Sequence, residues 1–359
     1  MKTSFRLAVG GFVGLLAAAS VLAAPADSTQ TRTFEFVYQM TIDPASTGAV
    51  NVWIPIAKSD ANQDVVLKSL SGLDASQVES GKRRESEYGN SVLYAQIKQT
   101  AAPVTVSLTY EVTRREYTRG GLNDLLRYNR ADDPALPEVA RFLAPDRLVP
   151  INDRFRALAA EITQGKKGDV EKAYAIYDYV FHNLRYDKSG EGWGRGDAMW
   201  ACDAKHGNCT DFHSLFIALM RAEKIPARFE IGFPLPEGKS DGDIPGYHCW
   251  AEFYVSGLGW VPVDISEAWK NPAKHDFYFG SLDTNRVQFT IGRDLVLNPP
   301  QSGPPVNYLV YPYAELDGQP YDHLEKRFSF RDLRAAQASL PVDVQRTLLP
   351  ARPASASGR

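Results

Sequence analysis

The sequence is poor in cysteine and contains no internal repeat. Three cysteines occur in 359 residues: Cys202, Cys209 and Cys249. Three are too few for a disulfide scaffold, and an odd number leaves at least one thiol unpaired in an oxidising compartment. An unpaired thiol is therefore the first candidate for chemistry.

Long apolar runs are missing after the first 24 residues. Lys2 and Arg6 are followed by an apolar stretch at residues 7–22 and then by small residues, a pattern typical of a secretory signal peptide at 1–24. The stretch is short and interrupted by glycines, and no second one follows, so it does not predict a membrane anchor. We expect a periplasmic or secreted protein without a membrane span.

The sequence also has no large excess of charge of either sign. The formal net charge is -3, and Lys and Arg form no stripe along the chain, which argues against nucleic acid as a partner. No Asp-rich loop resembles an EF-hand, so calcium is not implied.

The hydrophobic pattern changes along the chain. Apolar residues alternate with polar ones at 33–42, 50–54 and 104–112, which predicts strands of an antiparallel sandwich. Helical spacing begins at Asp169, which we expect to cap a helix. The predicted division is a β-sandwich domain at 30–118, a connector at 119–150, an α+β region at 151–272, a β-rich extension at 273–331, and a tail at 332–359 that ends disordered.

Cys209 lies at the start of a predicted helix. Phe212, Leu215, Phe216, Leu219 and Met220 follow at helical spacing and predict one buried face. Asn208 is a good N-cap and Asp211 resembles a capping-box partner, so Cys209 falls in the first turn. Unpaired N–H groups and the helix dipole favour a thiolate there. The alternative is a buried, inert cysteine, but a helix start beside a glycine turn is usually accessible.

A thiolate nucleophile needs a base and a group that orients the base. In the segment YHCWAEFYV, alternation puts His248 and Glu252 on the face opposite Cys249. Asp264 interrupts the apolar run GWVPVDI, so we expect an imidazole to pair with it. A hairpin centred near Ser256 would put Asp264 directly across from His248, whereas a two-residue turn would put it on the other face. Glu252 is the reserve candidate for the orienting group.

The segments GNCTDFHSLFIALMRAEKIPARFEIGF and YHCWAEFYVSGLGWVPVD resemble the core of the transglutaminase-like superfamily. The resemblance extends from about residue 169 to 266. It implies an α+β, papain-like core in which the helix bearing the cysteine packs on an antiparallel sheet. It also implies Cys209 as nucleophile, His248 as general base and acid, and Asp264 as the orienting group, acting on a protein or peptide amide without a cofactor. The preceding strand VWIPI resembles the N-terminal module of bacterial members.

Two features depart from the family pattern. Cys249 stands where the family usually has a small residue; it is either bonded to Cys202 or simply buried, and we favour burial. The family's second oxyanion donor is often an aromatic N–H upstream of the cysteine, for which Trp193 and Trp200 are candidates. A tunnel lined by these two and Trp250 would favour cross-linking over hydrolysis, because it would exclude water. The backbone N–H of Cys209 is the other donor we expect.

Two other kinds of function stay open. Cys209, His206, His213 and His248 could bind zinc, although no paired Cys or His motif supports a metal site. A transglutaminase-like fold could also serve as a binding module without catalysis. The sequence does not identify the substrate or the oligomeric state.

Overall fold

The computed structural model describes residues 30–43, 48–73, 78–98, 101–130 and 137–333. The predicted signal peptide at 1–24 and the predicted tail beyond residue 333 lie outside these ranges. No helix within them is long and apolar enough to span a membrane.

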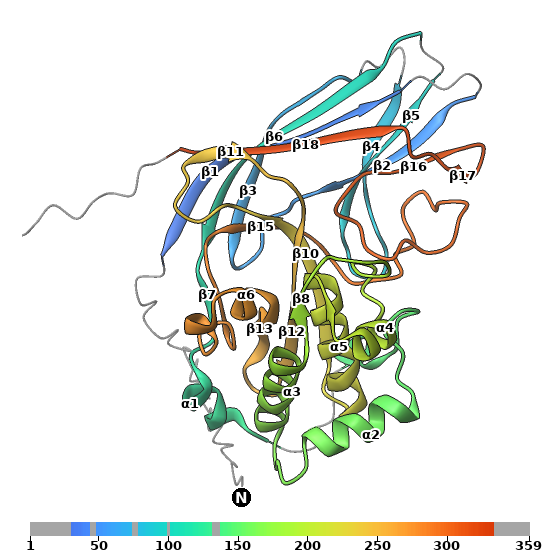
Figure 1. Ribbon diagram of the computed structural model, residues 1–359. Helices are drawn as coiled ribbons and strands as arrows, with labels where there is room; N and C mark the ends of the chain where they lie inside the picture. The colour runs from blue at the N-terminus through green and yellow to red at the C-terminus, as the bar shows by residue number, and fades with distance from the viewer. Residues whose placement is uncertain (1–29, 44–47, 74–77, 99–100, 131–136, 334–359) are drawn as a thin grey trace, which may run out of the picture.

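Two five-stranded antiparallel sheets form one end of the molecule (Figure 1). The first has the order β11 (Asp241–Asp243), β18 (Leu324–Asp332), β1 (Thr31–Ile42), β6 (Val104–Arg115) and β3 (Gln63–Ser71). The second has the order β17 (Gln319–Pro320), β16 (Tyr313–Leu316), β2 (Val50–Ile56), β5 (Ser91–Ile97) and β4 (Val78–Arg84).

The alternation predicted for β1 and β6 is confirmed, whereas β2 is buried on both faces because Trp53 lies in a second core cluster. In β1 the apolar residues Phe34, Phe36, Tyr38, Met40 and Ile42 are all buried, and the residues between them are half-buried. Successive side chains point to opposite faces of a strand, so this period of two puts one face of β1 in the core.

A four-stranded antiparallel sheet lies between the sandwich and the helices. Its order is β13 (Gly259–Val263), β12 (His248–Val255), β10 (Ala227–Pro234) and β15 (Arg286–Ile291). The helices around it are α2 (Asp153–Ile162), α3 (Asp169–Asn183), α4 (Ala198–Ala204), α5 (Cys209–Ala222) and α6 (Ile265–Lys270). Shorter elements are α1 (Leu122–Leu125), η1 (Leu126–Tyr128), η2 (Pro137–Leu143), η3 (Pro272–Lys274), β7 (Tyr117–Thr118), β8 (Arg185–Tyr186), β9 (His206–Gly207) and β14 (Ser281–Leu282). The fold is α+β, as predicted.

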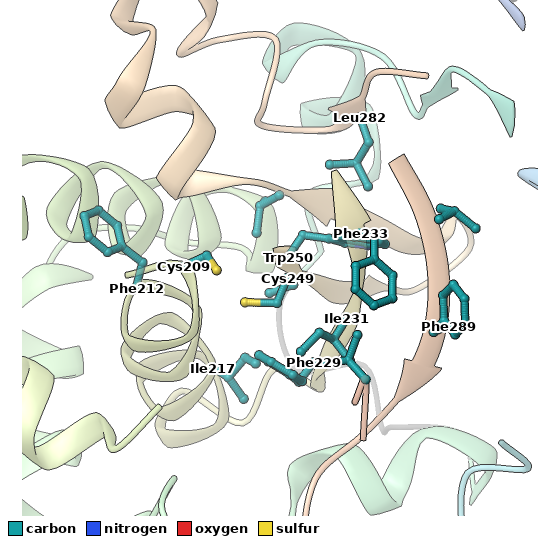
Figure 2. Packing of buried hydrophobic residues seen from close by; sticks show 14 of the residues in the cluster. Cys209, Phe212, Ile217, Phe229, Ile231, Phe233, Cys249, Trp250, Leu282 and Phe289 are labelled. Atoms are coloured by element: carbon teal, nitrogen blue, oxygen red, sulfur yellow. The ribbon is translucent and has the colours of Figure 1, made fainter. Parts of the chain in front are cut away.

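Both faces of the central sheet are covered. Helix α5 packs on one face, and Figure 2 shows Cys209 and Phe212 on that side and Phe233 and Phe289 on the other. Phe233 meets Phe36 of the sandwich with 5.3 Å between ring centroids, and Phe289 lies 5.2 Å from Phe233. This aromatic packing joins the central sheet to β1.

Two helix predictions need correction. Helix α5 is buried on all sides rather than along one face, because α2, α3, α4 and the sheet surround it and its polar side chains have partners in the interior. Helix α3 begins at Asp169, but the N-cap is Gly168, so Asp169 is the first helical residue and not the cap.

The ends of the described chain meet in the sandwich. Strand β18 pairs with β1, and β16 pairs with β2, so residues 313–332 complete the sheets that residues 31–115 begin. The short helices α1, η1 and η2 occupy part of the predicted connector. The division of the chain into separate domains remains a prediction.

Candidate active site

Cys209 is the first residue of α5, and the predicted capping box is present. The side chain of Asn208 accepts a hydrogen bond from Thr210 N at 2.9 Å, and the carboxylate of Asp211 accepts one from Asn208 N, also at 2.9 Å. The first N–H groups of a helix have no carbonyl partner within the helix and form its positive end. Because Cys209 is the first residue of α5, its side chain starts at this positive end.

Asp211 also fixes the glycine-rich loop that precedes α4. Its carboxylate accepts hydrogen bonds from Gly194 N at 2.7 Å and Gly196 N at 3.1 Å. Burial raises the pKa of Asp211 to about 6, although these N–H donors oppose the shift. The sequence pointed to Asp211 only as a cap, because its contacts with the loop depend on tertiary structure.

His248 and Asp264 form a buried pair. His248 Nε2 donates to Asp264 Oδ2 at 2.7 Å. The hairpin has neither of the two registers considered from the sequence: Ala251 pairs with Val263, and a three-residue connection joins β12 to β13. Strand β13 then ends, and Asp264 becomes the N-cap of α6, which turns its carboxylate toward His248.

The His248 imidazole and the Cys209 sulfur are hydrogen-bonded. Burial opposes ionisation of Cys209, but hydrogen bonds from Cys249 and His248 and the charge of His248 outweigh it, and the pKa of Cys209 lies well below its usual range. Burial also opposes the charge of His248, but Asp264 outweighs this effect and raises the pKa of His248 to about 10. The site therefore favours a thiolate and an imidazolium.

Arg286 supports Asp264, a role that was not predicted from the sequence. Its Nη1 donates to Asp264 Oδ2 at 2.8 Å, and the guanidinium lies 5.0 Å from the Trp250 ring centroid. Although burial opposes ionisation of Asp264, the charges of His248 and Arg286 hold its pKa well below the usual range. An arginine within the apolar strand RVQFTI was the available signal, because a buried charge requires a partner.

His213 links the cysteine to the aspartate through the backbone. Its Nδ1 donates to Cys209 O at 2.8 Å, and its Nε2 accepts from Ile265 N at 3.1 Å. Burial lowers the pKa of His213 to about 4, so the ring is neutral, and both its nitrogens are engaged. Within the described ranges, no three His, Cys, Asp or Glu side chains are arranged to hold a metal ion.

Cys209 is less accessible than its helix position suggested. It is 2 % exposed, and Tyr247 joins the residue before it to the glycine-rich loop. Tyr247 Oη accepts a hydrogen bond from Asn208 Nδ2 at 3.0 Å and contacts Gly194 O at 3.5 Å.

The three tryptophans lie in different surroundings. Trp250 is fully buried, and its indole N–H donates to Glu230 Oε2 at 2.9 Å, so this N–H is not free for an oxyanion. The Trp193 N–H donates to Gly190 O at 3.2 Å. The Trp200 ring packs against His206 with 5.2 Å between centroids. Trp200 is therefore the tryptophan whose role as a second donor remains a prediction.

The remaining candidates have structural partners. Glu252 is not the orienting group, because it accepts from Arg228 Nε at 2.6 Å. All three cysteines are free and buried, so the disulfide alternative is wrong and burial of Cys249 is confirmed. Figure 2 shows the sulfur atoms of Cys209 and Cys249 directed toward one another between α5 and β12.

Residues 156–265 match the sequence model of the transglutaminase-like superfamily. This segment is a transglutaminase-like core. It spans α2 to the start of α6 and contains Cys209, His248 and Asp264.

Two proteins of known sequence and one of known structure are similar to this chain. An uncharacterized protein of Haemophilus influenzae is 27% identical over 369 residues, which cover 92% of this chain and 98% of the relative. The uncharacterized protein YebA of Bacillus subtilis is 30% identical over 146 residues, which cover 37% of this chain but only 19% of YebA. A crystal structure from Cytophaga hutchinsonii, of a protein described as a candidate cysteine protease, has a TM-score of 0.52 at 19% identity and covers 84% of this chain and all of its own. This likeness shows that the two proteins share a fold.

Proposed function

We propose that this protein is a thiol enzyme that breaks an amide bond through Cys209, His248 and Asp264. The observation that carries the proposal is the buried series of hydrogen bonds from Cys209 to His248 and from His248 to Asp264. In this arrangement the thiolate is the nucleophile, the imidazolium is the acid, and the carboxylate fixes the ring and stabilises its charge.

The reaction divides into two steps. Cys209 Sγ bonds to the amide carbon, His248 gives its proton to the amine nitrogen, and the C–N bond breaks to leave a thioester. Water or a primary amine then attacks the thioester and loses a proton to His248, and the C–S bond breaks to release Cys209. We expect the backbone N–H of Cys209, at the start of α5, to stabilise the oxyanion.

The substrate that we propose is a protein or a peptide. The family resemblance supports a protein or peptide substrate. The Cytophaga hutchinsonii protein that is described as a candidate cysteine protease shares the fold. Attack by water would make the protein a peptidase or amidase, and attack by an amine would make it a cross-linking enzyme. We also infer export, on the basis of Lys2, Arg6 and the apolar stretch at 7–22.

A peptide library tests the reaction. N-blocked peptides, including glutamine-containing ones, are incubated with the protein with and without a primary amine, and the products are identified by mass spectrometry. We expect cleavage, deamidation or amine incorporation with the wild type and none with Cys209→Ala. A Cys202→Ala control should keep the activity, because that thiol lies in α4 and is not part of the site. Products formed equally by Cys209→Ala would exclude the proposed nucleophile, and a folded wild type that forms no product would favour a binding module.

A further inference from the structure

A cavity lies between the sandwich and the central sheet. Its volume is about 380 Å³, within the usual range for small-molecule sites. Residues 58–62, the end of β6 and β7 form one side of it, and β10, β12, β13 and β15 form the other. Cys209, His248 and Asp264 do not line this cavity.

Arg114 in the cavity wall is buried without full hydrogen bonding. It is 2 % exposed, and among the described residues its Nε has no hydrogen-bond partner. The other buried arginines are bonded to carboxylates or carbonyls; Arg286 bonds Asp264 and Arg293 bonds Gly196 O at 2.7 Å. A buried donor without an acceptor is costly, so the charge of Arg114 is poorly compensated by the protein, and Arg114 lines the cavity.

The acidic side chains in the cavity are already engaged. Arg228 binds both Glu252, at 2.6 Å, and Glu230, at 2.8 Å. Asp60 Oδ1 accepts from the backbone N–H groups of Asn62 and Gln63. The carboxylates of Glu230, Glu252 and Asp60 therefore accept hydrogen bonds from Arg228 and from the backbone.

Positive charge is left over in the cavity. Lys58 Nζ donates to a carbonyl, Gly89 O, at 3.1 Å, and Arg119 Nε donates to Trp260 O at 3.0 Å, so neither of these bonds neutralises a charge. Burial and the charge of Glu252 raise the pKa of Glu230 to about 8, although the charge of Arg228 opposes this shift. Even with every carboxylate ionised, the four basic side chains that line the cavity outnumber the three acidic ones.

We infer that this cavity binds a small molecule through a carboxylate or phosphate group, with Arg114 as the main contact and Lys58 as a second cation. The planar guanidinium fork matches both groups in geometry, and burial strengthens a charge-assisted hydrogen bond. The ligand contacts the part of Arg114 that lines the cavity and compensates the excess charge. This site is independent of the proposed reaction at Cys209.

Isothermal titration of the full chain with inorganic phosphate and, separately, with succinate tests the site at constant ionic strength. We expect saturable binding of one anion per chain. Arg114→Gln should weaken it roughly ten- to hundredfold, the range expected for a hydrogen bond to a charged group. Lys58→Gln should weaken it less. Arg331→Gln should leave it unchanged, because Arg331 lies in β18 of the same sheet, is exposed and pairs with Glu35.

The two anions distinguish the ligand class. Binding of phosphate alone indicates a phosphate-bearing ligand, and binding of succinate alone indicates a carboxylate-bearing one. The inference is overturned if neither anion binds saturably, or if the variants bind as the wild type does. If Arg114→Gln does not fold, Lys58→Gln and a phosphate-soaked crystal of the wild type decide: phosphate on Arg114 supports the inference, and its absence there contradicts it.

Discussion

Burial acts on the Cys209 thiol against the charged form that nucleophilic attack requires. Cys249 and His248 reverse this effect, because each hydrogen-bonds the sulfur and His248 also carries a positive charge. Asp264 and Arg286 support His248 from the other side. The ionisation of one sulfur therefore depends on groups from α5, β12, α6 and β15.

Cys249→Ala tests the contribution of the second thiol. Loss of its hydrogen bond should raise the pKa of Cys209 and slow alkylation of Cys209 near pH 6, while the rate at high pH stays the same. The measurement is the rate of iodoacetamide labelling at each pH, with peptide mapping. Cys202→Ala is the matched control, since it also removes a buried thiol and should not change the profile. An unaltered Cys249→Ala profile would contradict this role of Cys249.

The thiolate and imidazolium pair also predicts how stability depends on pH. The pKa of His248 is raised, so its contribution is complete below about pH 6.5 and is lost as pH rises through about 10. The pKa of Cys209 is lowered, so its contribution grows until about pH 8.5. Between about pH 6.5 and 8.5 the falling contribution of His248 and the rising contribution of Cys209 to stability oppose each other. Above about pH 8.5 only the loss of the His248 contribution remains.

Urea unfolding of the wild type and of a Cys209→Ala, His248→Gln double variant measures this dependence. The difference between their free energies of unfolding should stay nearly level from about pH 6.5 to 8.5 and fall from there to pH 10. A difference that does not change across the whole range would mean that the pair is not charged.

At the scale of elements, the start of α5 is the part of the site that sequence describes best. Caps and helical periodicity depend on residues a few positions apart, so Asn208, Asp211 and the helix could be predicted. The register of β12 and β13 could not, because the length of their connection was ambiguous. The partners of His213 and Arg286 come from other elements, so local patterns gave no account of them.

Gly207→Ala tests the close packing of Gly207 against Asp211 at the start of α5. A Cβ at Gly207 would clash with the Asp211 carboxylate, which cannot move without losing its hydrogen bonds to Gly194, Gly196 and Asn208. We expect a loss of about 2 kcal/mol or more in the free energy of unfolding, because buried polar groups lose partners. Gly121→Ala is the control; a Cβ there meets nothing within 4 Å, and the change should stay within about 0.5 kcal/mol. Equal effects of the two substitutions would contradict this account.

At the scale of the whole molecule, the last strands complete the sheets that the first strands begin. Alternation predicted strands at 33–42, 50–54 and 104–112, and a β-rich extension was predicted at 273–331. Pairing between residues 31–42 and 324–332 joins segments about 300 positions apart. No local pattern specifies such a pairing, so the sequence suggested an extension where the structure has shared sheets.

Truncation after residue 323 tests this closure. Removing β18 exposes one edge of β1. It also removes the aromatic contact between Tyr38 and Phe328, whose ring centroids lie 4.8 Å apart. We expect loss of cooperative unfolding, or aggregation, because an exposed edge strand pairs with other chains. Truncation after residue 333 keeps every described strand and should leave the unfolding midpoint unchanged. A stable, cooperative protein ending at residue 323 would contradict the proposed closure.

The central claim is that Cys209 is a nucleophile made ready by His248, and the rate of Cys209 alkylation by iodoacetamide against pH tests it most directly. An ordinary cysteine gives an apparent pKa of about 8.5. We predict a plateau that extends well below this value in the wild type and an apparent pKa at or above it in His248→Ala, with Cys209 identified by peptide mapping. An ordinary profile in both proteins would contradict the claim.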